Sequence, residues 1–116
     1  MILIIGAEAS GKREFAKKLG YTEDDFTTDP FDGKRVVYGV QNILFADHTR
    51  TQELYDALVD KDVVICNEVG SGVIPVEREV RLGREAAGRL CVLLAKDAEA
   101  VVRMVCGIPT IIKGQI

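Results

Sequence analysis

Blocks of apolar residues alternate with polar segments along this chain, in a pattern that predicts strands and helices in turn. The apolar runs are short and nearly uninterrupted, which is typical of strands buried on both faces of a sheet. We expect such strands at residues 1–5, 35–40, 62–66, 100–106 and 110–113, the last two being separated by the turn Gly107-Ile108-Pro109. Helices are expected between them, at residues 12–19, 51–59 and 76–96.

The helical segments carry apolar residues at the spacing of one helix face. In the first of them, Phe15, Ala16 and Leu19 share a face, and Gly20 is a stop signal. The longest helix is expected to bury Val80, Ala87, Leu90, Leu94 and Ala95. Because strands alternate with helices, the pattern predicts an α/β fold with a mostly parallel β-sheet flanked by helices.

The segment YTEDDFTTDPFDGK, residues 21–34, is acidic and rich in turn-forming residues, so we expect a loop there. Its carboxylates can be read in two ways, as a solvated turn or as a source of a metal ligand, and we favour the solvated turn. The carboxylates in question are Asp24, Asp25, Asp29 and Asp32.

Length and composition limit the classes of protein to be considered. The chain has 116 residues, 47% of them hydrophobic and 28% charged, as expected for a single globular domain spanning residues 1–116. A net charge of -3 argues against nucleic acid and anionic membrane as partners. The apolar runs are shorter than the roughly 18 residues of a membrane span, and the three cysteines show no metal-binding spacing. We therefore expect a cytoplasmic protein with reduced thiols and no resident metal.

The segment GAEASGKR follows the first expected strand and opens the first expected helix. It reads as the phosphate-binding loop G-x-x-x-x-G-K-[ST], in which glycines turn backbone N–H groups onto phosphate oxygens and lysine adds a full charge. The alternative is a glycine-rich turn that binds nothing. The residues expected to bind nucleotide are Gly6, Ala7, Glu8, Ala9, Ser10, Gly11, Lys12 and Arg13.

Arg13 departs from the motif, because a Ser or Thr hydroxyl at this position would coordinate Mg²⁺ and a guanidinium cannot. Phosphate binding can survive this change, whereas Mg²⁺ binding is weakened. Glu68 comes directly after the strand at 62–66, where P-loop proteins place an acid that holds Mg²⁺ through water or activates a nucleophile. Ligands of open α/β sheets bind at the carboxyl ends of the strands, so we expect the loop and Asn67-Glu68 to meet there.

The second half of the chain resembles the bifunctional adenosylcobinamide kinase/adenosylcobinamide-phosphate guanylyltransferases of cobalamin biosynthesis. The resemblance rests on NEVGSGVIP at 67–75, on the arginines and glycine of the following helix, and on GIPTIIK at 107–113. That family has N-E-V-G-x-G-I-V-P, then R-x-x-R-D-x-x-G-R, and a similar closing strand pair. It also begins with I-L-V-T-G-G-x-R-S-G-K-S, which ILIIGAEASGKR follows closely.

This resemblance implies a P-loop NTPase-like fold, here abbreviated, with ATP or GTP as substrate and adenosylcobinamide as acceptor. Lys12 would stabilise charge on the transferred phosphate, and Glu68 would organise the metal or activate the hydroxyl. Arg84 and Arg89 match family positions near phosphate or at an interface, and family assembly implies a homo-oligomer. Asn67 opens the matched motif.

Several family features are absent from this chain. The family's guanylylated histidine lies near an R-[IV]-x-x-H pattern in a segment that is shorter here, and His48 in FADHTRTQE lacks that pattern. We expect His48 to be a capping or surface residue, with a displaced nucleophile as the alternative. The family's loop arginine is Ala9 here, and Cys91-Val92 replace Asn-Gln. Guanylyl transfer is therefore expected to be lost.

These losses leave three hypotheses open. The first is a cobalamin-pathway kinase that transfers a phosphoryl group to adenosylcobinamide. The second is a degenerate paralogue that binds nucleotide or a partner without turnover. The third is a small P-loop kinase of another substrate. Nucleotide binding with and without Mg²⁺, and phosphoryl transfer to adenosylcobinamide, distinguish them.

Overall fold

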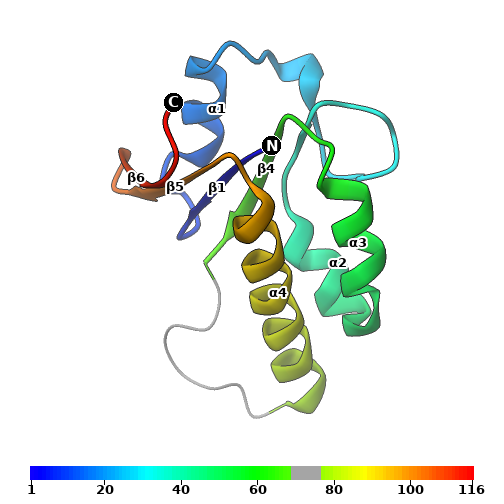
Figure 1. The fold of residues 1–116 in the computed structure, drawn as a ribbon. Helices are drawn as coiled ribbons and strands as arrows, with labels where there is room; N and C mark the ends of the chain where they lie inside the picture. Colours follow the sequence, from blue (N-terminus) through cyan, green and yellow to red (C-terminus); the bar gives the residue numbers. More distant parts are fainter. Residues whose placement is uncertain (69–76) are drawn as a thin grey trace.

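The computed structural model describes residues 1–68 and 77–116, which form a six-stranded sheet with helices on both faces (Figure 1). The strand order is β2-β3-β4-β1-β5-β6, and every neighbouring pair is parallel except β5 and β6. The strands are β1 (Ile2–Gly6), β2 (Phe26–Thr27), β3 (Val36–Val37), β4 (Val63–Asn67), β5 (Ala100–Val105) and β6 (Ile108–Lys113). The mostly parallel α/β fold predicted from the sequence is confirmed.

The central strand β1 is buried on both faces of the sheet, as its continuous apolar run predicts. Ile4 is aligned with Ile65 of β4 on one side and with Val102 of β5 on the other. Ile4 packs with the apolar residues under α1 (Lys12–Lys18), whereas Leu3 belongs to a larger core on the opposite face. Alternate side chains of one strand therefore contribute to two separate cores.

Three helices cover the face opposite α1. They are α2 (Val40–Ala46), α3 (Thr51–Leu58) and α4 (Arg78–Asp97), and they contact one another as well as the sheet (Figure 1). Leu44, Leu54 and Leu90, one from each helix, are fully or almost fully buried in the shared core. These three helices therefore form one packed layer on that face of the sheet.

The strand expected at 35–40 is shortened to Val36–Val37, and α2 begins at the last residue of that range, Val40. Only Val36 and Val37 pair with β4, because Gly39 adopts a left-handed conformation (φ 69°) and the chain turns there into the helix. The apolar side chains of Val40 and Leu44 then become buried against the helical layer. An apolar run of this length fits either structure, and the glycine decides between them.

Three further expectations need correction. The acidic segment 21–34 is not entirely loop, since it contains a 3₁₀ turn at Glu23–Asp25 and the edge strand β2. On α4, Val80 is 37% exposed and Ala95 only partly buried, while Gly83 and Ala86 lie on the buried face. The closing turn falls at Cys106-Gly107, both with positive φ, so Ile108 already belongs to β6. The ends of these elements and the burial of these side chains depend on how closely neighbouring elements pack. The spacing of apolar residues along the sequence does not contain that information.

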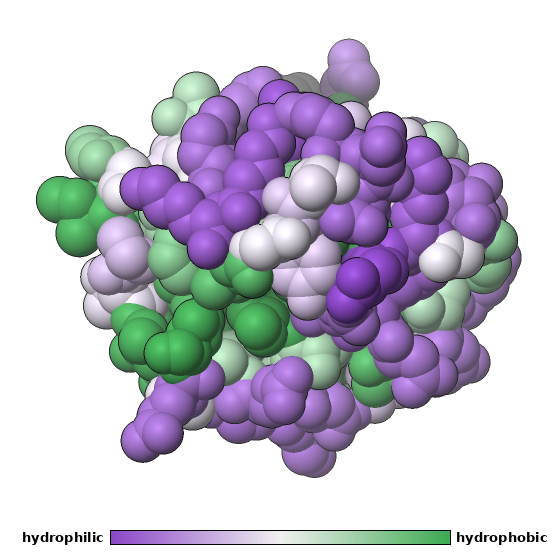
Figure 2. Space-filling view, turned by 90° about the horizontal axis from the view of Figure 1, so that it is seen from above, coloured by the Kyte–Doolittle hydropathy of each residue, from purple (hydrophilic) through white to green (hydrophobic). Residues whose placement is uncertain are grey.

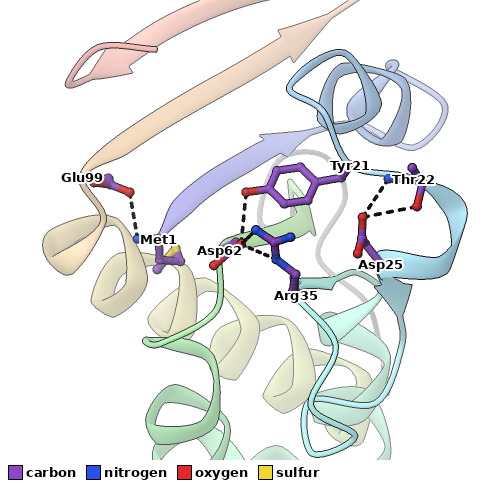
Figure 3. Close-up of polar contacts among 7 residues, drawn as sticks. All are labelled: Met1, Tyr21, Thr22, Asp25, Arg35, Asp62 and Glu99. Atoms are coloured by element: carbon purple, nitrogen blue, oxygen red, sulfur yellow. Dashed lines mark hydrogen bonds and ion pairs between the residues drawn. The ribbon is translucent and has the colours of Figure 1, made fainter.

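A polar network holds the amino ends of the strands together, at the edge opposite the loop between β1 and α1 (Figure 3). Asp62 precedes β4 and accepts hydrogen bonds from Arg35 (2.7 Å) and the Tyr21 hydroxyl (3.3 Å). The guanidinium carbon of Arg35 also lies over the Tyr21 ring, 5.2 Å from its centroid. At the same edge, the amino group of Met1 pairs with Glu99. These contacts link β1, β3, β4 and the start of β5.

The edge strand β6 is exposed along its whole length. Figure 2 shows apolar side chains gathered on the side of the molecule where β6 lies. The exposed large apolar residues of this region are Val105, Ile108, Ile111, Ile112 and Ile116.

The described helices include none that is long and apolar enough to span a membrane. The cysteines Cys66, Cys91 and Cys106 form no disulfide bond.

Candidate functional site

The loop between β1 and α1 has the compact shape that its two motif glycines permit. A Cβ atom at Gly6 would lie 2.6 Å from the Ser10 Oγ and 2.7 Å from the Met104 carbonyl oxygen. Gly11 has a φ of 93°, where an L side chain would be strained. The loop is closed internally by Ser10 N–H donating to Ala7 O at 3.3 Å. Both glycines are thus required by the loop itself, whatever ligand it binds.

Lys12 is the best-placed cation of the loop. It is 7% exposed, and its Nζ donates a hydrogen bond back to the Ala7 carbonyl oxygen across the loop. Burial lowers the pKa of Lys12, and the nearby carboxylate of Glu8 acts in the opposite direction. An anionic oxygen that replaces the carbonyl would give this desolvated ammonium a charged partner, so the arrangement favours phosphate.

A cavity of about 420 Å³ opens over the loop, within the size range of small-molecule sites. We call it the cradle cavity. Its walls come from the loop, from α2 and the residues before it, and from the end of β4. It is lined by Glu8 to Glu14, Thr28, Tyr38, Gly39, Gln41, Asn42, Ile65 and Asn67.

A second cavity of about 420 Å³, which we call the side cavity, adjoins the first on the β4 side. The two share Glu8, Gln41, Asn42 and Asn67 as lining residues. Its other lining residues are Ala7, Phe45 and Glu68. The carboxyl ends of β1 and β4 therefore carry two adjoining cavities, as expected for an open α/β sheet.

Arg13 lies on the wall of the cradle cavity. Its guanidinium carbon is 5.0 Å from the centroid of the Tyr38 ring, a cation–π contact. Tyr38 belongs to the residues that precede α2, so the contact joins α1 to the opposite wall of the cavity. The position that would supply a hydroxyl ligand to Mg²⁺ thus supplies positive charge instead.

Glu68 reaches the base of the loop, as predicted from its place after β4. Its backbone N–H donates to the Gly6 carbonyl oxygen at 2.8 Å, and its side chain lines the side cavity. Both carboxylate oxygens are held by Arg103 of β5, at 2.5 Å from Nε and 3.1 Å from Nη2. The bidentate pair with Arg103 lowers the pKa of Glu68. Glu68 is therefore an ionised and oriented carboxylate.

Comparison with known proteins identifies the chain's relatives. A model of the family described as cobinamide kinase / cobinamide phosphate guanyltransferase matches residues 36–112, which is more than half of the chain. The chain belongs to this family. No curated protein matches it significantly. The matched range contains Gln41, Asn67, Glu68 and Arg103, and it begins after the loop, so the loop's function rests on its geometry.

Other predicted residues of the family site lie outside both cavities. His48 follows the last turn of α2 and lines neither cavity, and its neighbour Asp47 accepts a hydrogen bond from Thr49 N–H. Arg84 is half-buried and Arg89 exposed on α4, and neither lines the cradle or the side cavity. The expected motif segment 69–75 lies outside the described residues.

The acidic segment uses its carboxylates to shape its own turns. Asp29 accepts a hydrogen bond from Phe31 N–H at 2.9 Å, and Asp32 accepts from Lys34 N–H at 3.0 Å and from the Thr27 hydroxyl. Within residues 1–68 and 77–116, no group of three or more His, Cys, Asp or Glu residues could hold a metal ion. These hydrogen bonds hold the turns of the segment in shape.

Sequence reasoning missed nine lining or supporting residues, namely Glu14, Thr28, Tyr38, Gly39, Gln41, Asn42, Phe45, Ile65 and Arg103. Three of them, Gln41, Asn42 and Phe45, lie on α2, and the sequence pattern predicted no element over residues 41–46. A usable signal existed for Arg103, because a charged residue inside the otherwise apolar strand VVRMV requires a partner. Gln41 gave a similar signal, as an amide inside the buried stripe of a short helix.

Proposed function

We propose that the protein is a nucleotide-dependent kinase of the cobinamide kinase family. It binds ATP or GTP at Gly6 to Lys12 and transfers the terminal phosphoryl group to the hydroxyl of adenosylcobinamide. The observation that carries the proposal is the buried Lys12 Nζ at the floor of a cavity of about 420 Å³, at the carboxyl ends of β1 and β4. Family membership supplies the class of acceptor.

The chemistry required of this chain is mainly positioning and charge stabilisation. The acceptor oxygen attacks the terminal phosphorus, the bond to the bridging oxygen breaks, and the nucleoside diphosphate leaves with that bond's electron pair. Lys12 leaves the Ala7 carbonyl and pairs with the phosphate oxygens, while Arg13 adds a second cation at the cavity wall. Glu68, in the adjoining side cavity, can orient the acceptor hydroxyl with its negative charge, and the hydroxyl proton passes to solvent water, because the pair with Arg103 lowers the pKa of Glu68 and makes it a weak base.

The residues of this site do not fit a directly bound Mg²⁺. The position of the hydroxyl ligand is Arg13, and both oxygens of Glu68 are hydrogen-bonded to Arg103. We therefore assign no step to Mg²⁺. The same observation favours a second candidate function, a paralogue that binds nucleotide without turnover, because two positions that would organise the metal are engaged elsewhere.

The experiment that tests the proposal has two stages. ATP and GTP are titrated into the protein by calorimetry, with Mg²⁺ and with EDTA, and transfer of labelled terminal phosphate to adenosylcobinamide is then measured. The proposal expects saturable binding and transfer, both abolished by Lys12→Ala. Binding without transfer would favour the paralogue, and transfer to another hydroxyl acceptor would favour a small kinase of another substrate. Absence of binding at millimolar nucleotide would refute all three.

Guanylyl transfer is not part of the proposal, because His48 lacks the family's histidine pattern and lines neither cavity. We further propose that residues 1–116 act as one domain in the cytoplasm and assemble into a homo-oligomer. The exposed apolar edge of β6 supports assembly, since unpaired edges of this kind favour pairing with another chain. Sedimentation of the wild type and of Ile112→Lys tests it, and a monomeric wild type would contradict it.

A further inference from the structure

Gln41 is a buried polar residue whose side-chain oxygen has no partner. It lies in the first turn of α2 and is 8% exposed, and its Oε1 makes no hydrogen bond within the described structure. Buried polar atoms in folded proteins are almost always hydrogen-bonded, so each exception calls for a physical explanation. A leucine or methionine could fill the same place in the helix without leaving an unsatisfied oxygen.

The position of Gln41 supplies that explanation. It lines the cradle cavity and the side cavity, together with Glu8, Asn42 and Asn67. Gln41 is thus part of the wall where the two cavities meet. A ligand group that crosses from one cavity to the other would pass this residue, and a donor on that group would satisfy the unpaired oxygen.

The lining of the side cavity indicates what kind of ligand it suits. Three carboxamides, those of Gln41, Asn42 and Asn67, lie beside the ring of Phe45, and the charged residues Glu8 and Glu68 are both acidic. Carboxylates disfavour an anionic ligand, and the described lining of the side cavity, unlike that of the cradle cavity, includes no lysine or arginine to offset them. Carboxamides both donate and accept hydrogen bonds. The cavity therefore suits a neutral group that bears hydroxyl or amide functions, and the phosphates belong over Lys12 in the cradle cavity.

We infer that the side cavity is the acceptor subsite and that Gln41 is a specificity-determining residue whose Oε1 accepts a hydrogen bond from the acceptor's hydroxyl or amide N–H. The hydroxyl oxygen, oriented by this bond, then faces the terminal phosphate at the junction of the two cavities. This inference rests on the proposed phosphoryl transfer. The inference adds where the acceptor binds and which residue recognises the acceptor.

The test is the variant Gln41→Met, which keeps an unbranched side chain of similar length and removes the hydrogen-bonding group. Affinity for nucleotide is measured by calorimetry, and affinity for cobinamide by titration of its visible absorbance in the presence of a non-hydrolysable nucleotide. Loss of one hydrogen bond to a buried partner is expected to weaken cobinamide binding about ten-fold and to leave nucleotide affinity unchanged. Thermal stability should stay equal or rise, because no hydrogen bond of the folded protein is lost.

The matched control is Thr51→Val at the start of α3, since the Thr51 Oγ1 is also buried without a partner and Thr51 lines neither cavity. It should be as stable as the wild type or more so, with unchanged cobinamide binding. Equal cobinamide affinity in the wild type and Gln41→Met would overturn the inference, as would a marked fall in melting temperature for Gln41→Met alone. A wild type that binds nucleotide but not cobinamide would overturn the acceptor subsite and leave the phosphate cradle standing.

Discussion

Two glycines of α4 provide a paired test of how closely the helices pack. A Cβ atom built at Gly83 would lie 2.5 Å from Cδ1 and 2.9 Å from Cα of Phe45, and 3.2 Å from the Leu44 carbonyl oxygen. At Gly88, on the same helix, a Cβ atom would meet nothing within 4 Å. Gly83 therefore allows α2 to approach α4, whereas Gly88 makes no such contact.

The expected free energies have opposite signs. Alanine is favoured over glycine in a helix interior by about 1 kcal/mol, so Gly88→Ala should stabilise the fold by roughly that amount. Gly83→Ala gains the same propensity but forces α2 away, and overpacking of this kind typically costs about 1–3 kcal/mol. The ring of Phe45 can rotate away, but its Cα cannot, so part of that cost remains. We expect the two variants to differ by about 2 kcal/mol, which corresponds to roughly 8 °C in melting temperature for a chain of this size.

Urea denaturation followed by circular dichroism measures both variants against the wild type. Because α2 carries Gln41 and Asn42, Gly83→Ala should also weaken cobinamide binding, whereas Gly88→Ala should not change it. If Gly83→Ala proved as stable as Gly88→Ala, the close contact between α2 and α4 would not exist in solution. The reasoning that links this contact to the cavities would then fail as well.

Three further predictions concern the loop, the ion pair and the core. Burial lowers the pKa of Lys12, so nucleotide affinity should fall as the pH rises towards that pKa, below the usual 10.5, and Lys12→Arg should remove this alkaline loss in a calorimetric pH series. Arg103 lowers the pKa of Glu68 from the usual 4.5, so the pair stabilises the fold fully above pH 4.5 and loses this effect as the pH falls through the lowered pKa. The difference in melting temperature between the wild type and Arg103→Gln should therefore be present at pH 7 and vanish in acid. Leu54→Ala removes a fully buried side chain and should destabilise the fold by about 2–5 kcal/mol in the same urea assay, with an unchanged m-value.

The loop between β1 and α1 could be located from the sequence because its requirements are local. The glycines Gly6 and Gly11 are dictated by backbone geometry within a few residues, and Lys12 follows them directly. Glu68 was placed correctly for a similar reason, since the carboxyl end of a parallel strand lies at a known edge of the sheet. The ion pair of Glu68 could not be predicted in the same way, because its partner Arg103 comes from β5, on the other side of β1.

The helix α2 shows why the remaining part of the site could not be predicted. Its apolar pattern over 35–46 fits a strand and a short helix equally well, and the left-handed Gly39 and the packing against α4 decide for the helix. Once α2 forms, Gln41 and Asn42 face the loop and complete both cavities. A seven-residue helix has little stability of its own, so its tertiary contacts determine that it forms.

The sequence by itself determined the alternation of strands and helices, the glycine loop between β1 and α1, and the family, because each is encoded in neighbouring residues or in ordered motifs. The tertiary structure decided which residues surround that loop. Arg13 lies on Tyr38, Glu68 is held by Arg103, and Gln41 is buried without a partner where two cavities meet. These arrangements depend on contacts between segments far apart in the chain, and such contacts exist only after the sheet and both helical layers have assembled.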